Sequence, residues 1–236
     1  MNHSSDLLVI GAHPDDAEIH AGGLLALASS KGLKTAILDL TEGELGTRGD
    51  CNIRKQESLE AAKILGSERF NLQLPDGGIG DNPIFLDQVV TFIRSRRPRI
   101  CVIPSPADRH PDHRNAHSLL KKALFMSGLS QFLSKEKPWR PEAILWVGGE
   151  NPSVPDVVVD ISTVWLNKMK ALGAYRSQFD PNFDENQTRI SHPTFLRGIE
   201  GRSMHWGSLI QSNYAEAFWI DKPLQPILIR FLDSLR

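Results

Sequence analysis

The sequence has few cysteines, no long apolar run and almost no net charge. Its two cysteines, Cys51 and Cys101, lie far apart and outside a CxxC pair, which argues against a disulfide framework and favours a reducing cytoplasm. The formal net charge of −1, without a basic stripe, gives no support to binding of nucleic acid or of a membrane surface. No stretch approaches the ~18 apolar residues of a membrane span, and the amino terminus lacks the basic region of a signal peptide. We therefore expect a soluble, cytoplasmic protein.

Alternating apolar runs and helical patterns predict an α/β fold. At 236 residues, 40% of them hydrophobic, the chain suits one large domain, so we expect a single domain over residues 1–236. The alternation is typical of a doubly wound, Rossmann-like, mostly parallel sheet with helices on both faces. The expected strands are 7–10, 35–40, 70–74, 100–103, 143–147, 157–160 and 214–220. The expected helices are 15–30, 53–65, 83–96, one from near Pro111 to 127, 161–172 and 195–211, with an exposed loop or lid at 180–194.

A short polar cluster, His13-Pro14-Asp15-Asp16, follows the first expected strand. Pro14 and the two aspartates are typical of the first turn of a helix. The cluster therefore lies at the carboxyl end of a central strand, where open α/β sheets build their sites. One imidazole and two carboxylates suit a cation such as zinc. The alternative is that the aspartates only cap the helix and that His13 is incidental.

A second cluster follows the fourth expected strand and repeats this layout. It contains three histidines, His110, His113 and His117, together with Asp112. If the helix begins near Pro111, His113 and His117 lie one turn apart on one face, and His110 sits just before the helix. Asp112 either caps this helix or orients His110. Three histidines at one strand end, matched by the first cluster at another, indicate a metal site.

The ligand types favour a catalytic site over a structural one. Structural zinc sites are closed by four ligands, mostly cysteine, whereas catalytic sites have about three and keep a water. Neither cluster contains cysteine, and histidine with aspartate offers three ligands and one spare carboxylate as a general base. Bound zinc lowers the pKa of its water to about 7, and a remaining histidine can donate to an oxyanion. The pattern predicts metal-assisted hydrolysis of an amide or ester.

The polar, glycine-rich segment 41–50 is expected to shape a substrate site, because it contains neither GxxxxGK[ST] nor GxGxxG. Arg54 opens the next helix, where it is either a solvated surface residue or an anion-binding group. A non-catalytic Rossmann-like sugar or nucleotide binder is the rival class, but such a binder would need a phosphate loop.

Several motifs resemble those of a known enzyme family. AHPDD at 12–16 and DRHPDH at 108–113 resemble the PIG-L/LmbE-like superfamily of zinc-dependent N-acetylglucosamine deacetylases. Similar segments continue along most of the chain: GELGTRG, RKQESLEAAKILG, LPDGG, PDVVVDIS, YRSQF and NYAEAF. The resemblance looks closest to the bacillithiol-biosynthesis branch, which deacetylates N-acetylglucosaminyl-L-malate. It implies the LmbE-like version of the α/β fold.

The resemblance also implies a ligand set and a base. It implies one Zn²⁺ per chain, bound by His13, Asp16 and His113. Asp15 is then the general base for attack of zinc-activated water on the amide. His117 becomes a supporting or packing residue rather than a ligand.

Stabilisation of the oxyanion is implied for a second group of residues. The resemblance implies that His110, held by Asp112, stabilises the oxyanion or assists proton transfer. Some relatives place a tyrosine from the carboxyl-terminal region there, but an approximate register puts Phe195 at that position. Tyr175 and Tyr214 are the tyrosines of this chain, so His110 acts alone unless one of them reaches the site.

Substrate and assembly are implied in the same way. Arg54 and Arg109 look like substrate contacts, because the planar fork of arginine suits the carboxylates of malate. The partner is a small amino-sugar conjugate, with inositol- or chitobiose-type conjugates as alternatives. Resemblance further implies a homo-oligomer, either a trimer or a hexamer.

Overall fold

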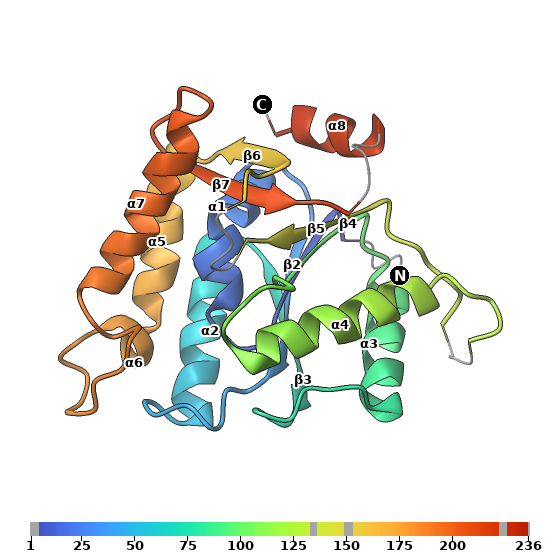
Figure 1. Cartoon of the computed structure of the whole chain (residues 1–236), viewed down its shortest axis with the longest axis horizontal. Coiled ribbons are helices and arrows are strands. Elements are labelled where there is room, and N and C mark those ends of the chain that lie inside the picture. Colours follow the sequence, from blue (N-terminus) through green and yellow to red (C-terminus); the bar gives the residue numbers. More distant parts are fainter. Residues whose placement is uncertain (1–4, 133–135, 149–152, 222–225, 236) are drawn as a thin grey trace.

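The computed structural model describes residues 5–132, 136–148, 153–221 and 226–235. Its centre is a seven-stranded sheet with the order β3-β2-β1-β4-β5-β7-β6 (Figure 1). Strands β1 to β5 pair in parallel, whereas β7 runs antiparallel to both of its neighbours. The strands are β1 (Leu7–Gly11), β2 (Thr35–Thr41), β3 (Glu68–Leu74), β4 (Ile100–Ile103), β5 (Ala143–Val147), β6 (Val157–Asp160) and β7 (Ala215–Trp219).

Helices cover both faces of this sheet, because the central strands are apolar on both sides. In β1, Leu7 and Val9 belong to one hydrophobic core, and Leu8 and Ile10 belong to the other. The first core is completed by α1 (Asp16–Ser30), α2 (Cys51–Leu65), α5 (Trp165–Ala174), α7 (Thr194–Ser208) and α8 (Pro226–Asp233). The second core is completed by α3 (Pro83–Arg96) and α4 (Pro111–Met126).

The expected α/β class and mostly parallel sheet are confirmed. One difference is the direction of β7, which the structure inserts antiparallel between β5 and β6. Another lies in the helix expected at 161–172, which begins as a 3₁₀ turn at Ser162–Val164 and is followed by the short α6 (Arg176–Phe179). Helix α8 has no counterpart among the helices expected from the sequence. Within the described part of the chain, the helices are too short or too polar to cross a membrane.

The chain reverses direction across the sheet between β1 and β4, and this reversal positions the site. From β1 the chain adds β2 and β3 on one side, then crosses back to add β4 on the other. When the connections from two adjacent parallel strands run in opposite directions, the loops at the carboxyl ends of these strands leave a crevice between them. The two polar clusters follow β1 and β4, so both open into this crevice.

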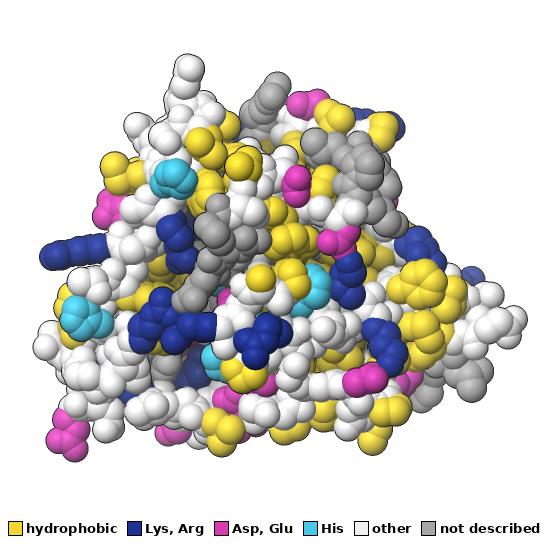
Figure 2. Space-filling model, viewed as in Figure 1, with side chains coloured by type: hydrophobic (Ala, Val, Ile, Leu, Met, Phe, Trp, Pro, Cys, Tyr) yellow, Lys and Arg dark blue, Asp and Glu magenta, His cyan; other side chains and the backbone are white. Residues whose placement is uncertain are grey.

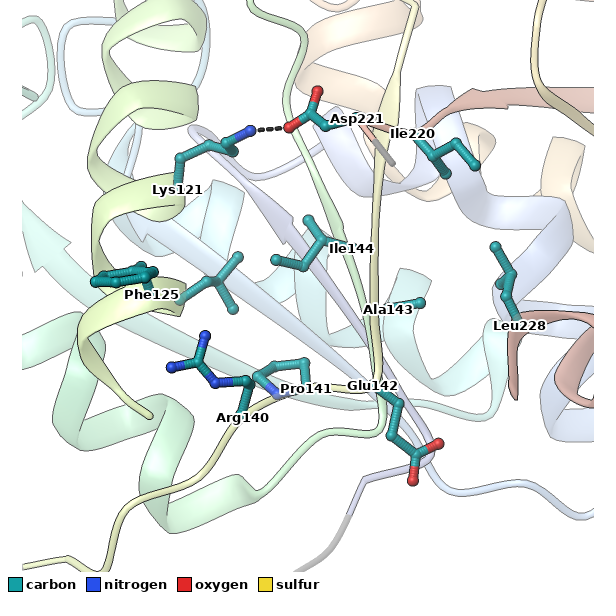
Figure 3. A pocket seen from close by; sticks show the side chains of 11 residues that line it. Lys121, Phe125, Arg140, Pro141, Glu142, Ala143, Ile144, Ile220, Asp221 and Leu228 are labelled. Atoms are coloured by element: carbon teal, nitrogen blue, oxygen red, sulfur yellow. Dashed lines mark ion pairs between the residues drawn. The ribbon is translucent and has the colours of Figure 1, made fainter. Parts of the chain in front are cut away.

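A separate cavity of about 250 Å³ lies at the opposite edge of the sheet, where β5 begins. Figure 3 shows the apolar side chains of Phe125, Ile144 and Leu228 around it, with an ion pair between Lys121 and Asp221 on one side. No residue of the two polar clusters lines this mainly apolar cavity.

Candidate metal centre

The junction between β1 and α1 has an unusual backbone. Asp15 adopts φ 116° and ψ −26°, which is strained for a residue with a Cβ. Arg54 holds this junction: it donates to the Pro14 carbonyl at 2.5 Å and to the Gly43 carbonyl at 3.1 Å, and lies 3.4 Å from Asp15 Oδ2. Asp15 is the N-cap residue of α1 but makes no side-chain capping bond. Its buried carboxylate is therefore positioned for something other than capping.

The next residue turns its carboxylate toward the second cluster. Asp16 Oδ2 accepts a hydrogen bond from the His13 backbone N–H at 2.9 Å. Asp16 Oδ1 lies 3.2 Å from His113 Nε2, and Oδ2 lies 3.7 Å from His13 Nδ1. Asp16 thus bridges the two histidines. His110 lies close by, and one ring nitrogen from each of His13, His110 and His113 lies within 4.8 Å of the others, so these three could also hold a metal ion.

Each of these two histidines has its other ring nitrogen on a carboxylate. His13 Nε2 lies 3.0 Å from Asp76 Oδ1 and 3.4 Å from Asp112 Oδ2. His113 Nδ1 lies 3.1 Å from Asp108 Oδ2. Metal-bound histidines are commonly oriented by a carboxylate on the second nitrogen. The arrangement therefore fits a cation between His13 Nδ1, His113 Nε2 and Asp16.

The local charge is consistent with this fit. Burial lowers the pKa of the His13 ring, but the carboxylates of Asp112, Asp16 and Asp76 outweigh it and raise that pKa to about 12. For His113, Asp16 and Asp108 likewise outweigh burial and raise the pKa to about 10. Surplus negative charge around two imidazoles favours a positive charge between them. The donor set, nitrogen with carboxylate oxygen, suits zinc.

Asp15 and His110 have different electrostatic surroundings. Burial raises the pKa of Asp15 to about 7, although the charge of Arg54 opposes this rise. A carboxyl group with a pKa near 7 is well matched to general base work at neutral pH. Burial, with the charges of His13 and His113, lowers the pKa of His110. Both groups face the same cavity as His13.

The contacts of Asp112 differ from the expectation that it holds His110. Its Oδ2 lies 3.4 Å from His13 Nε2 and accepts a hydrogen bond from the Gly77 backbone N–H at 2.7 Å. The Asp112 backbone N–H, not its carboxylate, donates to His110 Nδ1 at 3.2 Å. The reason is that His110 is itself the N-cap residue of α4. The Asp112 carboxylate therefore orients His13.

The structure separates His117 and both tyrosines from the centre. His117 Nδ1 lies 2.9 Å from the Pro104 carbonyl oxygen, and its ring packs edge-on to Trp146. The buried Tyr175 hydroxyl donates to Glu18, and Tyr214 stacks on Trp165. At the position where relatives were expected to carry a tyrosine, Phe195 lines the cavity.

The two predicted substrate arginines both line this cavity of about 480 Å³. Arg109 is exposed at its rim. Arg54 is only 4% exposed and binds the backbone and Asp15. The structure therefore gives Arg54 a positioning role toward Asp15, and its contact with substrate stays a prediction.

Among the cavity residues that the sequence did not single out are two aspartates, Asp76 and Asp108, and two arginines, Arg189 and Arg202. Asp76 belongs to the LPDGG segment, which resembles the family but carries no residue role in the sequence-based expectations. Its position after β3, two strands from β1 in the sheet, was the signal that could have found it. The arginines lie in segments without a motif, so only the structure finds them.

The chain is similar to several known proteins, of which three are described here. The diacetylchitobiose deacetylase of Thermococcus kodakarensis is 31% identical over 228 residues, covering 91% of this chain and 82% of the relative. The probable N-acetyl-alpha-D-glucosaminyl L-malate deacetylase 2 of Bacillus cereus is 27% identical over 238 residues, covering 92% of this chain and 97% of the relative. The crystal structure of a conserved protein from Thermus thermophilus has a TM-score of 0.87 at 37% identity, covering 94% of this chain and 96% of that chain.

A family profile matches the first half of the chain. Residues 8–124 match the family described as "PIG-L: GlcNAc-PI de-N-acetylase". The matched segment contains both polar clusters, helix α1 and most of helix α4.

Proposed function

The chain belongs to the PIG-L family, and on this premise we propose that it is a zinc-dependent amide hydrolase that removes the N-acetyl group from an N-acetylglucosamine conjugate. The observation that carries the proposal is the placement of Asp16 between His13 and His113, with the buried Asp15 beside it. The two neighbouring carboxylates thus have different environments: that of Asp16 suits a metal ligand, and that of Asp15 suits a group that accepts a proton.

His13, Asp16 and His113 would hold the metal. When bound, zinc polarises the acetamide carbonyl and lowers the pKa of water. Asp108 and the pair Asp76 and Asp112 keep the histidine rings in orientation through their second nitrogens.

The chain's other groups move the protons. Asp15 takes a proton from the attacking water, whose oxygen bonds to the acetyl carbon. His110, at the cavity wall, donates to the oxygen that becomes negative. The carbon–nitrogen bond then breaks, and Asp15 or His110 returns the proton to the amine. Acetate and the free amino sugar are the products.

We favour N-acetylglucosaminyl-L-malate as substrate, as in bacillithiol biosynthesis. Supporting this choice are the arginines that line the cavity, including Arg109, and the relative from Bacillus cereus, whose name contains that conjugate. A chitobiose-type conjugate is the alternative, supported by the relative from Thermococcus kodakarensis. An inositol-type conjugate belongs to the same reaction class.

Release of free amine tests the proposal. Metal-stripped protein is incubated with N-acetylglucosaminyl-L-malate or N,N'-diacetylchitobiose, with and without zinc. We expect zinc to restore release, and Asp15→Asn to lower kcat about a hundredfold or more while keeping bound zinc. Asp87→Asn, an exposed site on α3, is the matched control. Loss of zinc from Asp15→Asn would overturn the assignment of ligand and base, and absence of release from both conjugates would contradict the proposed activity on them.

A further inference from the structure

A second cavity, of about 340 Å³, adjoins the candidate metal centre on the side of α7. The two cavities share four lining residues, namely Ile19, His20, Arg189 and Arg202. His20 lies one helical turn after Asp16 on α1, so the second cavity opens beside a proposed metal ligand. A substrate whose acetamide lies at the metal centre can therefore extend into this second cavity.

A buried ion pair contributes to the lining of the second cavity. Lys168 Nζ lies 2.6 Å from Glu216 Oε1 and also donates to the Ile19 carbonyl at 2.9 Å. The Glu216 carboxylate accepts hydrogen bonds from the backbone N–H groups of Gly23 and Leu24 at 2.8 and 2.7 Å. These two charges therefore compensate one another within the protein.

The other fully charged side chains that line the second cavity are both arginines. Arg189 and Arg202 are exposed, and Glu216, already paired with Lys168, is the acidic side chain among the described lining residues. Burial and the charge of Arg202 lower the pKa of His20, which agrees with a guanidinium next to this shared histidine. On the face shown in Figure 2, basic side chains gather between α7 and α4.

We propose that the second cavity is the subsite for a carboxylate-bearing aglycone, bound by Arg189 and Arg202. The inference rests on the proposed function and names the part of the chain that selects the conjugate. Guanidinium groups bind carboxylates through paired hydrogen bonds. Trp206 and Trp219 line the same cavity and offer an apolar wall for the carbon skeleton of the aglycone. Arg54 lines the cavity of the metal centre but is absent from the lining of the second cavity.

Paired substrates and a binding measurement test the inference. The double variant Arg189→Gln/Arg202→Gln is compared with wild type on N-acetylglucosaminyl-L-malate and on methyl N-acetylglucosaminide, which lacks the carboxylates. We expect KM for the malate conjugate to rise about tenfold or more, with kcat/KM for the methyl glycoside changed less than about twofold. Arg197→Gln replaces an exposed arginine on α7, the helix that carries Arg202, and is the control. It should change neither KM for the malate conjugate nor kcat/KM for the methyl glycoside.

The binding arm uses zinc-loaded protein and the product glucosaminyl-L-malate in calorimetry. We expect the double variant to bind it about tenfold more weakly than wild type and than Arg197→Gln. Equal losses on both substrates, or unchanged affinity for the product, would overturn the subsite. If the wild-type protein releases no amine, the proposed function fails. The subsite proposal is then tested by product binding alone. A wild-type protein that does not bind the product would overturn the subsite as well.

Discussion

The ion pair between Lys168 and Glu216 predicts a large loss of stability on Lys168→Met. Helix α1 is kinked at Ala21, where φ is −139° and ψ is 16°. A regular helix joins the Gly23 N–H to the Ile19 carbonyl, and at this kink each of these groups has a side-chain partner, Glu216 and Lys168 respectively. Methionine keeps the length of the lysine stem but removes the donor and the charge.

The size of this stability loss depends on how deeply the ion pair is buried and on the hydrogen bonds that Glu216 keeps. The side chains of Lys168 and Glu216 are 2% and 3% exposed. Removing one partner of a buried ion pair costs about 3–5 kcal/mol. Glu216 keeps two backbone N–H donors, so we expect the lower end, about 3 kcal/mol. For a chain of this size that corresponds to a fall in Tm of roughly 6–12 °C.

Thermal unfolding followed by circular dichroism measures this fall. Lys170→Met, at an exposed position on the same helix α5, should change the free energy of unfolding by no more than about 0.5 kcal/mol. A fall in Tm below about 2 °C for Lys168→Met would show that water or rearranged side chains replace the ammonium. Equal falls for both lysine variants would mean that helix α5, rather than the ion pair, is responsible.

Three further predictions follow from other features. Zinc added to metal-stripped protein at a thousandfold excess over Kd should raise the free energy of unfolding by about 4 kcal/mol. A thermal scan should show the corresponding rise in Tm, and His113→Ala should abolish it. Arg69→Met removes the buried partner of Asp39, and burial raises the pKa of Asp39 to about 6. Without Arg69, the Asp39 carboxyl binds its proton still more tightly in the folded state than in the unfolded state. In denaturant titrations the variant should therefore lose more stability at pH 8 than at pH 5. Burial raises the pKa of the Cys101 thiol, so iodoacetamide should modify the half-buried Cys51 first by mass spectrometry, and rapid modification of Cys101 would contradict the buried position.

Much of the fold was predictable because apolar periodicity reports burial directly. The bounds of α3, β4, β5 and β6 agree with the expected residues 83–96, 100–103, 143–147 and 157–160. The direction of β7 was not predictable, because a run of buried residues has the same pattern whether a strand runs parallel or antiparallel. Only the pairing with β5 and β6 decides it.

The convergence of the two clusters was predictable from topology, because carboxyl ends of neighbouring parallel strands lie together. The partner of the Asp112 carboxylate was not, since the rotation of the first turn of α4 decides whether it faces His110 or His13. Burial of Arg54 was equally hidden, because it depends on carbonyl groups from two loops that meet only in the folded chain.

The position of β7 also constrains the order of events during synthesis. In the described sheet, β6 is hydrogen-bonded to β7 and stands at the edge, so it must wait for a strand made much later. Pairings between segments distant in sequence form slowly. Glu216 lies on the same strand, so the kink of α1 acquires its ion pair only after β7 has been made, long after α1 itself. A chain stalled before β7 would expose the open edge of β5, a hazard for misassembly with other chains.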